Sequence, residues 1–212
     1  DMLATPTATI QTKSATVAVD GAHPNYTAKY TMIGTDTEGA IAFTLDFTDE
    51  SGNAATTVTS VTDATAVTFD RTVPTATAVT IVSDNADTTK AKTGDEITIS
   101  FTVDDDMLAT PTATIQTKAA TVAVDGAHPN YTAKYTLIGT DTEGAVAFTL
   151  DFSDEAGNAA TTVTAVTDAT AVTFDRTLPT ATAVTIVSDN ATNTVAKTGD
   201  EITVSFTVDD TL

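Results

Sequence analysis

The side chains of this sequence that could bind a cation are carboxylates in turn segments. Three consecutive aspartates, Asp104, Asp105 and Asp106, follow one alternation of apolar and polar residues, and Asp154 follows another. Ca²⁺ takes six to eight oxygen ligands in flexible geometry, whereas Mg²⁺ demands a stricter octahedron. A supply of carboxylates and backbone carbonyls in loops therefore favours calcium as the cofactor.

Catalytic residues are not expected. The two histidines, His23 and His128, are one position duplicated, and each lies in the turn sequence Asp-Gly-Ala-His-Pro-Asn. The chain has no Cys, and no Ser stands in a nucleophile elbow. Paired acids could hydrolyse glycosides, but that reaction needs a cleft. A short duplicated β-domain offers no obvious cleft. We therefore expect that the protein is not an enzyme.

The carboxylates belong to a tandem duplication. The sequence Asp1–Lys13 recurs letter for letter at Asp106–Lys118, which sets a period of 105 residues, and only 13 of the 107 pairs at that spacing differ. A period of this length is a whole domain and is far longer than one coil of a solenoid. Each repeat is long enough to bury its own hydrophobic core.

The repeat boundary is predicted at the string Phe69–Pro74, where a proline follows the end of an apolar alternation. This division gives one complete repeat at residues 72–176. Residues 1–71 correspond to a repeat without its first two strands, and residues 177–212 correspond to the first two strands of the next. Two interpretations follow, either a longer covalent array or completion of one chain by strands from another.

Period-2 alternation predicts about seven strands and no helix in the complete repeat. The predicted strands are residues 76–83, 97–103, 112–117, 121–124, 131–137, 146–152 and 159–175, the last with a bend near Thr167–Asp168. The predicted core is Ile97, Ile99, Phe101, Tyr135, Leu137, Phe148, Leu150 and Phe152. Seven short strands separated by Gly, Asn and Asp turns are typical of an all-β, immunoglobulin-like β-sandwich.

Five strings of the repeat resemble the bacterial Ig-like repeats of giant surface adhesins. They are Gly94–Thr102, Tyr131–Tyr135, Asp141–Gly144, Asp151–Asn158 and Val172–Thr177. The resemblance covers the whole chain and implies a secreted, cell-surface or filament-forming protein. In that family the repeats act as spacers that calcium often stiffens.

The sandwich topology places the acidic loops at the joints between repeats. In strand order A to G, the B–C, D–E and F–G loops share the end at which the chain enters, and this end faces the previous repeat. Carboxylates that crowd there repel by about 1 kcal/mol per pair in water, and a divalent cation removes that repulsion. The candidate calcium ligands are Asp104, Asp105, Asp106, Asp125 and Asp154 of one repeat, with Asp36, Glu38 and Asp70 of the preceding one.

Charge and composition limit the partners. The formal net charge is -20, from 29 acidic and 9 basic residues, so neither nucleic acid nor an anionic membrane surface is an expected partner. The sequence has no stretch of 18 consecutive apolar residues, so insertion into a membrane is not predicted.

The expected function is a structural spacer in a secreted adhesin or extracellular filament, with neighbouring repeats as head-to-tail partners and lateral self-association as a further option. The first alternative is a filament subunit in which residues 177–212 of one copy complete residues 1–71 of the next. A carbohydrate- or ice-binding module is the second alternative. It would show an exposed aromatic row or a flat Thr array, whereas Thr is scattered over all strands.

Overall fold

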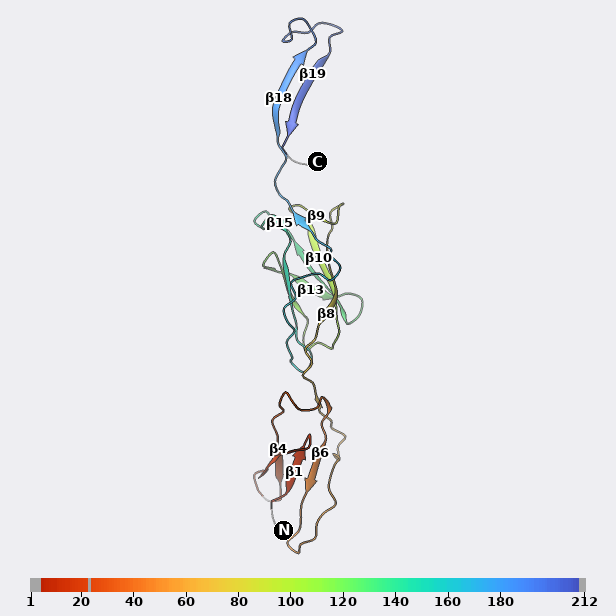
Figure 1. The fold of residues 1–212 in the computed structure, drawn as a ribbon, viewed down its shortest axis with the longest axis vertical. Coiled ribbons are helices and arrows are strands. Elements are labelled where there is room, and N and C mark those ends of the chain that lie inside the picture. The colour runs from red at the N-terminus through yellow and green to blue at the C-terminus, as the bar shows by residue number, and fades with distance from the viewer. Residues whose placement is uncertain (1–4, 23, 210–212) are drawn as a thin grey trace.

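The chain is all-β and elongated in the computed structural model, which describes residues 5–22 and 24–209 (Figure 1). The predicted all-β class is therefore confirmed. Each sheet takes its strands from only one of three stretches of chain, which we call the N-terminal segment (5–71), the central segment (72–176) and the C-terminal segment (177–209). Within the described residues there is no helix, and so none that is long and apolar enough to cross a membrane.

The central segment contains ten strands in three sheets. The largest sheet has the order β13-β14-β10-β8, a second has the order β12-β11-β16, and a third has the order β15-β17-β9. The bounds are β8 (Ala76–Ser83), β9 (Lys90–Ala91), β10 (Glu96–Val103), β11 (Thr112–Ile115), β12 (Lys118–Ala119), β13 (Thr121–Val124), β14 (Asn130–Thr136), β15 (Gly144–Ala145), β16 (Phe148–Asp151) and β17 (Thr173–Phe174).

One hydrophobic core lies between these sheets. Strand β10 alternates strictly, with Ile97, Ile99 and Phe101 buried and the threonines and serine between them half-buried. Side chains from β8, β14 and β16 complete the same cluster. Seven of the eight predicted core residues are buried. Tyr135 is half-buried, and its hydroxyl donates to the Asp141 carboxylate, 3.2 Å away.

Residues 159–175, predicted as one bent strand, pass from one sheet to another. The first part forms isolated bridges to β16 and its neighbourhood, at Ala159 and Val163. The chain then turns at Ala169, whose φ is +64°, and the Thr167 amide donates to the Val79 carbonyl in β8 at 2.9 Å. Only β17 near its end is a regular strand, so the predicted bend is confirmed but a continuous strand is not found.

The N-terminal segment repeats part of the central arrangement. Its strands are β1 (Thr7–Ile10), β2 (Lys13–Ser14), β3 (Thr16–Val19), β4 (Tyr26–Lys29), β5 (Gly39–Ala40), β6 (Phe43–Asp46) and β7 (Thr68–Phe69). The pairings β2-β1-β6, β3-β4 and β5-β7 are those of β12-β11-β16, β13-β14 and β15-β17, each 105 residues earlier. Within the described residues it has no counterpart of β8, β9 and β10.

The C-terminal segment is a two-stranded antiparallel hairpin that projects from the central segment (Figure 1). It consists of β18 (Ala181–Ser188) and β19 (Ile202–Val208). These are the counterparts of β8 and β10 by the 105-residue period. The apolar side chains of the hairpin are largely exposed, since no second sheet packs against it among the described residues.

Candidate metal centre

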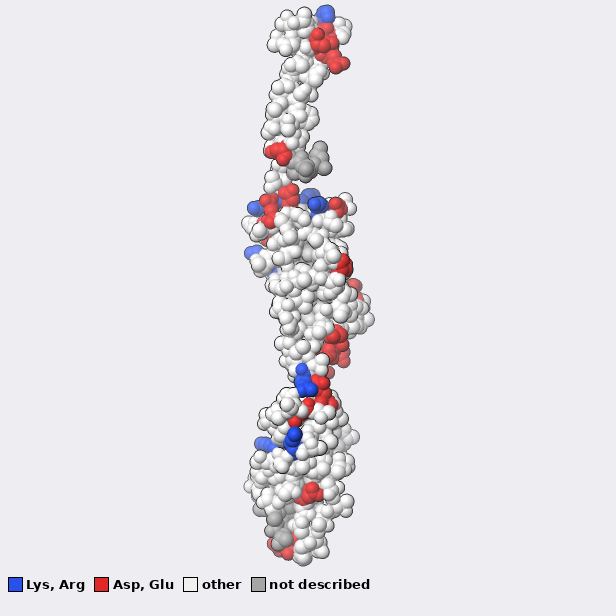
Figure 2. All heavy atoms as spheres, in the orientation of Figure 1, with Lys and Arg blue, Asp and Glu red and all other residues white. Residues whose placement is uncertain are grey.

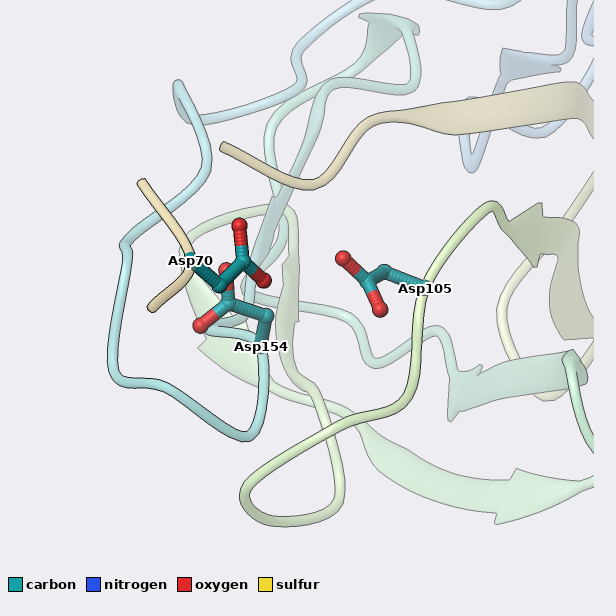
Figure 3. A group of neighbouring side chains, drawn as sticks. All are labelled: Asp70, Asp105 and Asp154. Carbon is teal, nitrogen blue, oxygen red and sulfur yellow. The ribbon is translucent and has the colours of Figure 1, made fainter. Parts of the chain in front are cut away.

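Three carboxylates meet where the N-terminal and central segments join. Asp70, Asp105 and Asp154 each place one oxygen within 4.8 Å of the others (Figure 3). They are the one group of at least three potential metal ligands that the described part of the chain contains. In water, carboxylates at this separation repel by about 1 kcal/mol per pair, and more where they are partly desolvated.

Asp154 is held by the tight turn that follows β16. Its side chain is almost completely buried, with 1% exposed. The Asn158 amide and the Asn158 side-chain nitrogen donate to its two oxygens at 2.7 and 2.8 Å. Gly157 allows this turn because its φ is +93°, a conformation that disfavours other residues. The carboxylate is therefore fixed in place before any cation binds.

Asp105 comes from the loop after β10, which is attached to the same turn. The Glu155 amide donates to the Asp106 carbonyl at 2.9 Å, and the Leu108 amide donates to the Ser153 carbonyl at 3.1 Å. The Asp106 amide also donates to the Asp105 carboxylate at 2.7 Å, which sets the orientation of that side chain. Two loops far apart in sequence thus bring Asp105 and Asp154 close together.

Asp70 reaches this surface from the connection between the segments. The Asn158 side chain donates to the Asp70 carbonyl at 3.3 Å, which links the connection to the turn of the central segment. On the other side, the Arg71 amide and the Thr72 hydroxyl donate to Glu38 at 3.0 and 2.9 Å. The Arg71 guanidinium also donates to the Gly34 carbonyl. Both segments therefore hold the connection.

The other predicted ligands lie outside the group of three carboxylates. Asp104 accepts from the Thr75 hydroxyl and amide at 2.6 and 2.7 Å, and these bonds lower the pKa of its carboxyl. Asp36 is buried and accepts from the Tyr30 hydroxyl and the Ile33 amide.

Glu38 is part of the connection and is not one of the three grouped carboxylates. The hydrogen bonds from Thr72 and Arg71 lower the pKa of Glu38. Asp106 contributes its backbone carbonyl to the loop pairing. Asp125 is exposed in the turn after β13 and lies outside the group.

Asn158 also shapes this group, and it is not among the ligands predicted from the sequence. It anchors Asp154 and also contacts the connection at Asp70. The signal was present in the Asp-x-x-Gly-Asn string, in which the last residue closes the turn and can donate back to the first. What the string does not reveal is the second contact, because it depends on the path of a segment 88 residues earlier.

No family model matches the chain, and no curated protein matches it.

Proposed function

We propose that this chain is part of an extracellular array of immunoglobulin-like sandwiches that acts as a spacer, with calcium bound at the joints. The observation that carries this proposal is the convergence of Asp70 from one side of a joint with Asp105 and Asp154 from the other. A cation held by all three carboxylates would bind both segments at once and fix the angle between them.

The strand order supports the immunoglobulin-like assignment. In strand order A to G, β8, β10, β13 and β14 take the places of A, B, D and E, and their sheet has the order A-B-E-D. Strands β11 and β16 take the places of C and F, and the bridge from Leu150 to Val163 adds the segment in the place of G. This division into A-B-E-D and C-F-G is that of immunoglobulin constant-type domains.

The joint geometry supports a spacer role. The three segments follow one another along the long axis of the molecule (Figure 1). The contacts of Arg71 with Glu38 and Gly34 recur as contacts of Arg176 with Glu143 and Gly139. A connection that each preceding repeat anchors in the same way produces a regular array, which sets a distance between its ends.

The acidic surface supports a cation and an extracellular location. Acidic groups gather around the joint and near the ends of the segments (Figure 2). Millimolar calcium, as in extracellular fluids, suits a site with three carboxylates whose remaining ligands are carbonyls and water. Chains with such high negative charge also stay soluble and resist non-specific association.

Thermal unfolding at a series of calcium concentrations tests the site. Binding to the folded state alone raises stability by RT ln(1 + [Ca²⁺]/Kd), about 2.7 kcal/mol at a hundredfold excess over Kd. The melting temperature should therefore rise with the logarithm of calcium concentration. Asp105→Asn should remove most of this rise, whereas the matched variant Asp125→Asn, in an exposed turn of the same segment, should retain it. An equal rise in both variants would contradict the site.

A further inference from the structure

The two outermost stretches of the central segment lie side by side and run in the same direction. We call β8 to β9 (residues 76–91) the first stretch and residues 167–175, which end with β17, the last stretch. Strand β17 pairs with β9 in parallel, with Phe174 opposite Ala91. Among the described residues every other pairing between strands is antiparallel. The contact between the two stretches is therefore unlike the rest of the fold.

Hydrogen bonds connect the two stretches along their length. The bonds are 2.9 to 3.0 Å long and include those that join Thr167 to Val79, Thr170 to Ile81, Thr173 to Thr89 and Asp175 to Ala91. Most of them run from an amide of the last stretch to a carbonyl of the first, whereas the Ile81 amide donates to the Thr170 hydroxyl. The residue numbers rise together from bond to bond, so the parallel contact extends well beyond β9 and β17.

This contact closes one side of the hydrophobic core. Val79 and Ile81 of the first stretch and Val172 and Phe174 of the last are at most 3% exposed, and all four belong to the core cluster. Water therefore competes little for the hydrogen bonds between the stretches while the core is intact. Separating the stretches breaks these bonds and exposes the core in the same step.

Tension along the molecule would slide the two stretches past each other. The central segment lies between the other two segments along the long axis (Figure 1). The first stretch begins at the joint with the N-terminal segment, where Ala76 lies opposite Val103. The last stretch ends at the opposite joint, where Arg176 donates to the Gly139 carbonyl. Pulling the neighbouring segments apart draws each stretch along its own axis in opposite directions. Because the hydrogen bonds cross from one strand to the other, this sliding strains them together.

We propose that the parallel contact between residues 76–91 and residues 167–175 is a load-bearing clamp, which keeps the central segment folded while the array transmits tension. The inference rests on the proposed spacer role, because a spacer is placed under tension when its two ends are pulled apart. Sliding must break several hydrogen bonds at once, whereas peeling from one end breaks them in turn. Forced unfolding is governed by the unfolding rate and not by the equilibrium stability, so the clamp provides a resistance that depends on the direction of pulling.

Single-molecule pulling of one variant in two directions tests the clamp. The chain has no cysteine, so Thr93→Cys provides a single attachment point in the exposed turn between β9 and β10. The first direction pulls the two ends of the chain apart. The second pulls the introduced cysteine against the C-terminal end. Gly94 and Arg176 both bond to carbonyls of residues 137–139, so the two attachment points of the second direction act at the same end of the central segment. This direction peels β17 from β9.

At equal constant force in excess chelator, the central segment should unfold at least about tenfold more slowly in the first direction than in the second, because two or more hydrogen bonds must break together. Its unfolding is identified by a gain in length of about 300 Å in either direction. Equal rates in the two directions, or faster unfolding in the first, would overturn the clamp. Such a result would leave the calcium dependence of the melting temperature unaffected, so the clamp and the calcium-bound spacer can fail separately.

A matched pair of threonine substitutions tests the hydrogen bonds of the clamp. Thr170→Val removes the acceptor of the Ile81 amide, whereas Thr114→Val removes a hydrogen bond to Thr149 between β11 and β16, outside the clamp. Both threonines are half-buried. Under end-to-end tension, Thr170→Val should unfold about fivefold faster than the unmodified chain. Thr114→Val should unfold at close to the unmodified rate, as should Asp168→Ala, which removes only the other partner of the Thr170 hydroxyl within the turn. Equal acceleration by Thr170→Val and either control would refute the clamp.

Discussion

A matched pair of leucine substitutions separates a completed core from an open one. Leu150 and Leu45 are the same position in successive repeats. Leu150 is fully buried, and it lies in the cluster that β8 and β10 close. Leu45 is half-buried and lines a groove of about 810 Å³ in the N-terminal segment. The identical change therefore meets two different environments in one molecule.

Leu150→Ala should lower the stability of the central segment by about 2 to 5 kcal/mol, through lost burial and the cavity that remains. A loss of 2 kcal/mol corresponds to about 8 °C or more in the melting temperature of a domain of this size. Leu45→Ala should leave this transition unmoved, since Leu45 lies in the N-terminal segment and is not part of the core cluster of the central segment.

Differential scanning calorimetry of the two variants and the unmodified chain makes the comparison. If Leu45→Ala lowered this transition as much as Leu150→Ala, Leu45 would support the same cooperative unit as Leu150, and the reasoning from their different environments would be wrong.

Three further predictions concern single polar residues. Burial alone would raise the pKa of Asp95, but hydrogen bonds from Lys92 and Asn85 outweigh it and lower the pKa from 3.8 to about 2. Ionised Asp95 therefore stabilises the folded state by about 2 kcal/mol above pH 4, and this stabilisation is lost as pH falls toward 2. In acid unfolding, Asp95→Asn should therefore lose less stability over this pH range than the unmodified chain. Asn158→Ala removes the side-chain donor to buried Asp154 and the contact with the Asp70 carbonyl, and it should destabilise the calcium-free protein by about 1 to 3 kcal/mol in urea titration. It should also weaken calcium binding, measurable by calorimetry. Tyr135→Phe removes the hydroxyl donor to buried Asp141 and should cost about 1 kcal/mol in the same titration, with no effect on calcium affinity.

The local alternation of apolar and polar residues predicted several of the longer strands. Residues 76–83 and 121–124 were predicted with the bounds that β8 and β13 have. Strand β10 was predicted with its buried face, because four apolar residues at period 2 leave one register in which all are covered. The two-residue strands β9 and β12 were not predicted, since a pair of residues carries no period.

The joint shows where sequence reasoning reached its limit. The loops that supply carboxylates follow from strand order, and Asp70, Asp105 and Asp154 were among the predicted ligands. Which of the consecutive aspartates faces the joint depends on the backbone of the loop. Asp104 turns to Thr75 and Asp105 turns to Asp154, a difference that one residue of turn geometry decides and that composition cannot reveal.

Small-angle scattering of the chain with and without calcium is the sharpest test of calcium stiffening, because it reports the arrangement of the segments at a joint. With millimolar calcium, the carboxylates of Asp70, Asp105 and Asp154 should be bridged, and the scattering should match one extended arrangement. With excess chelator, repulsion between them should widen the range of angles and shorten the mean maximum dimension. Identical scattering curves in the two conditions would contradict a calcium-stiffened spacer.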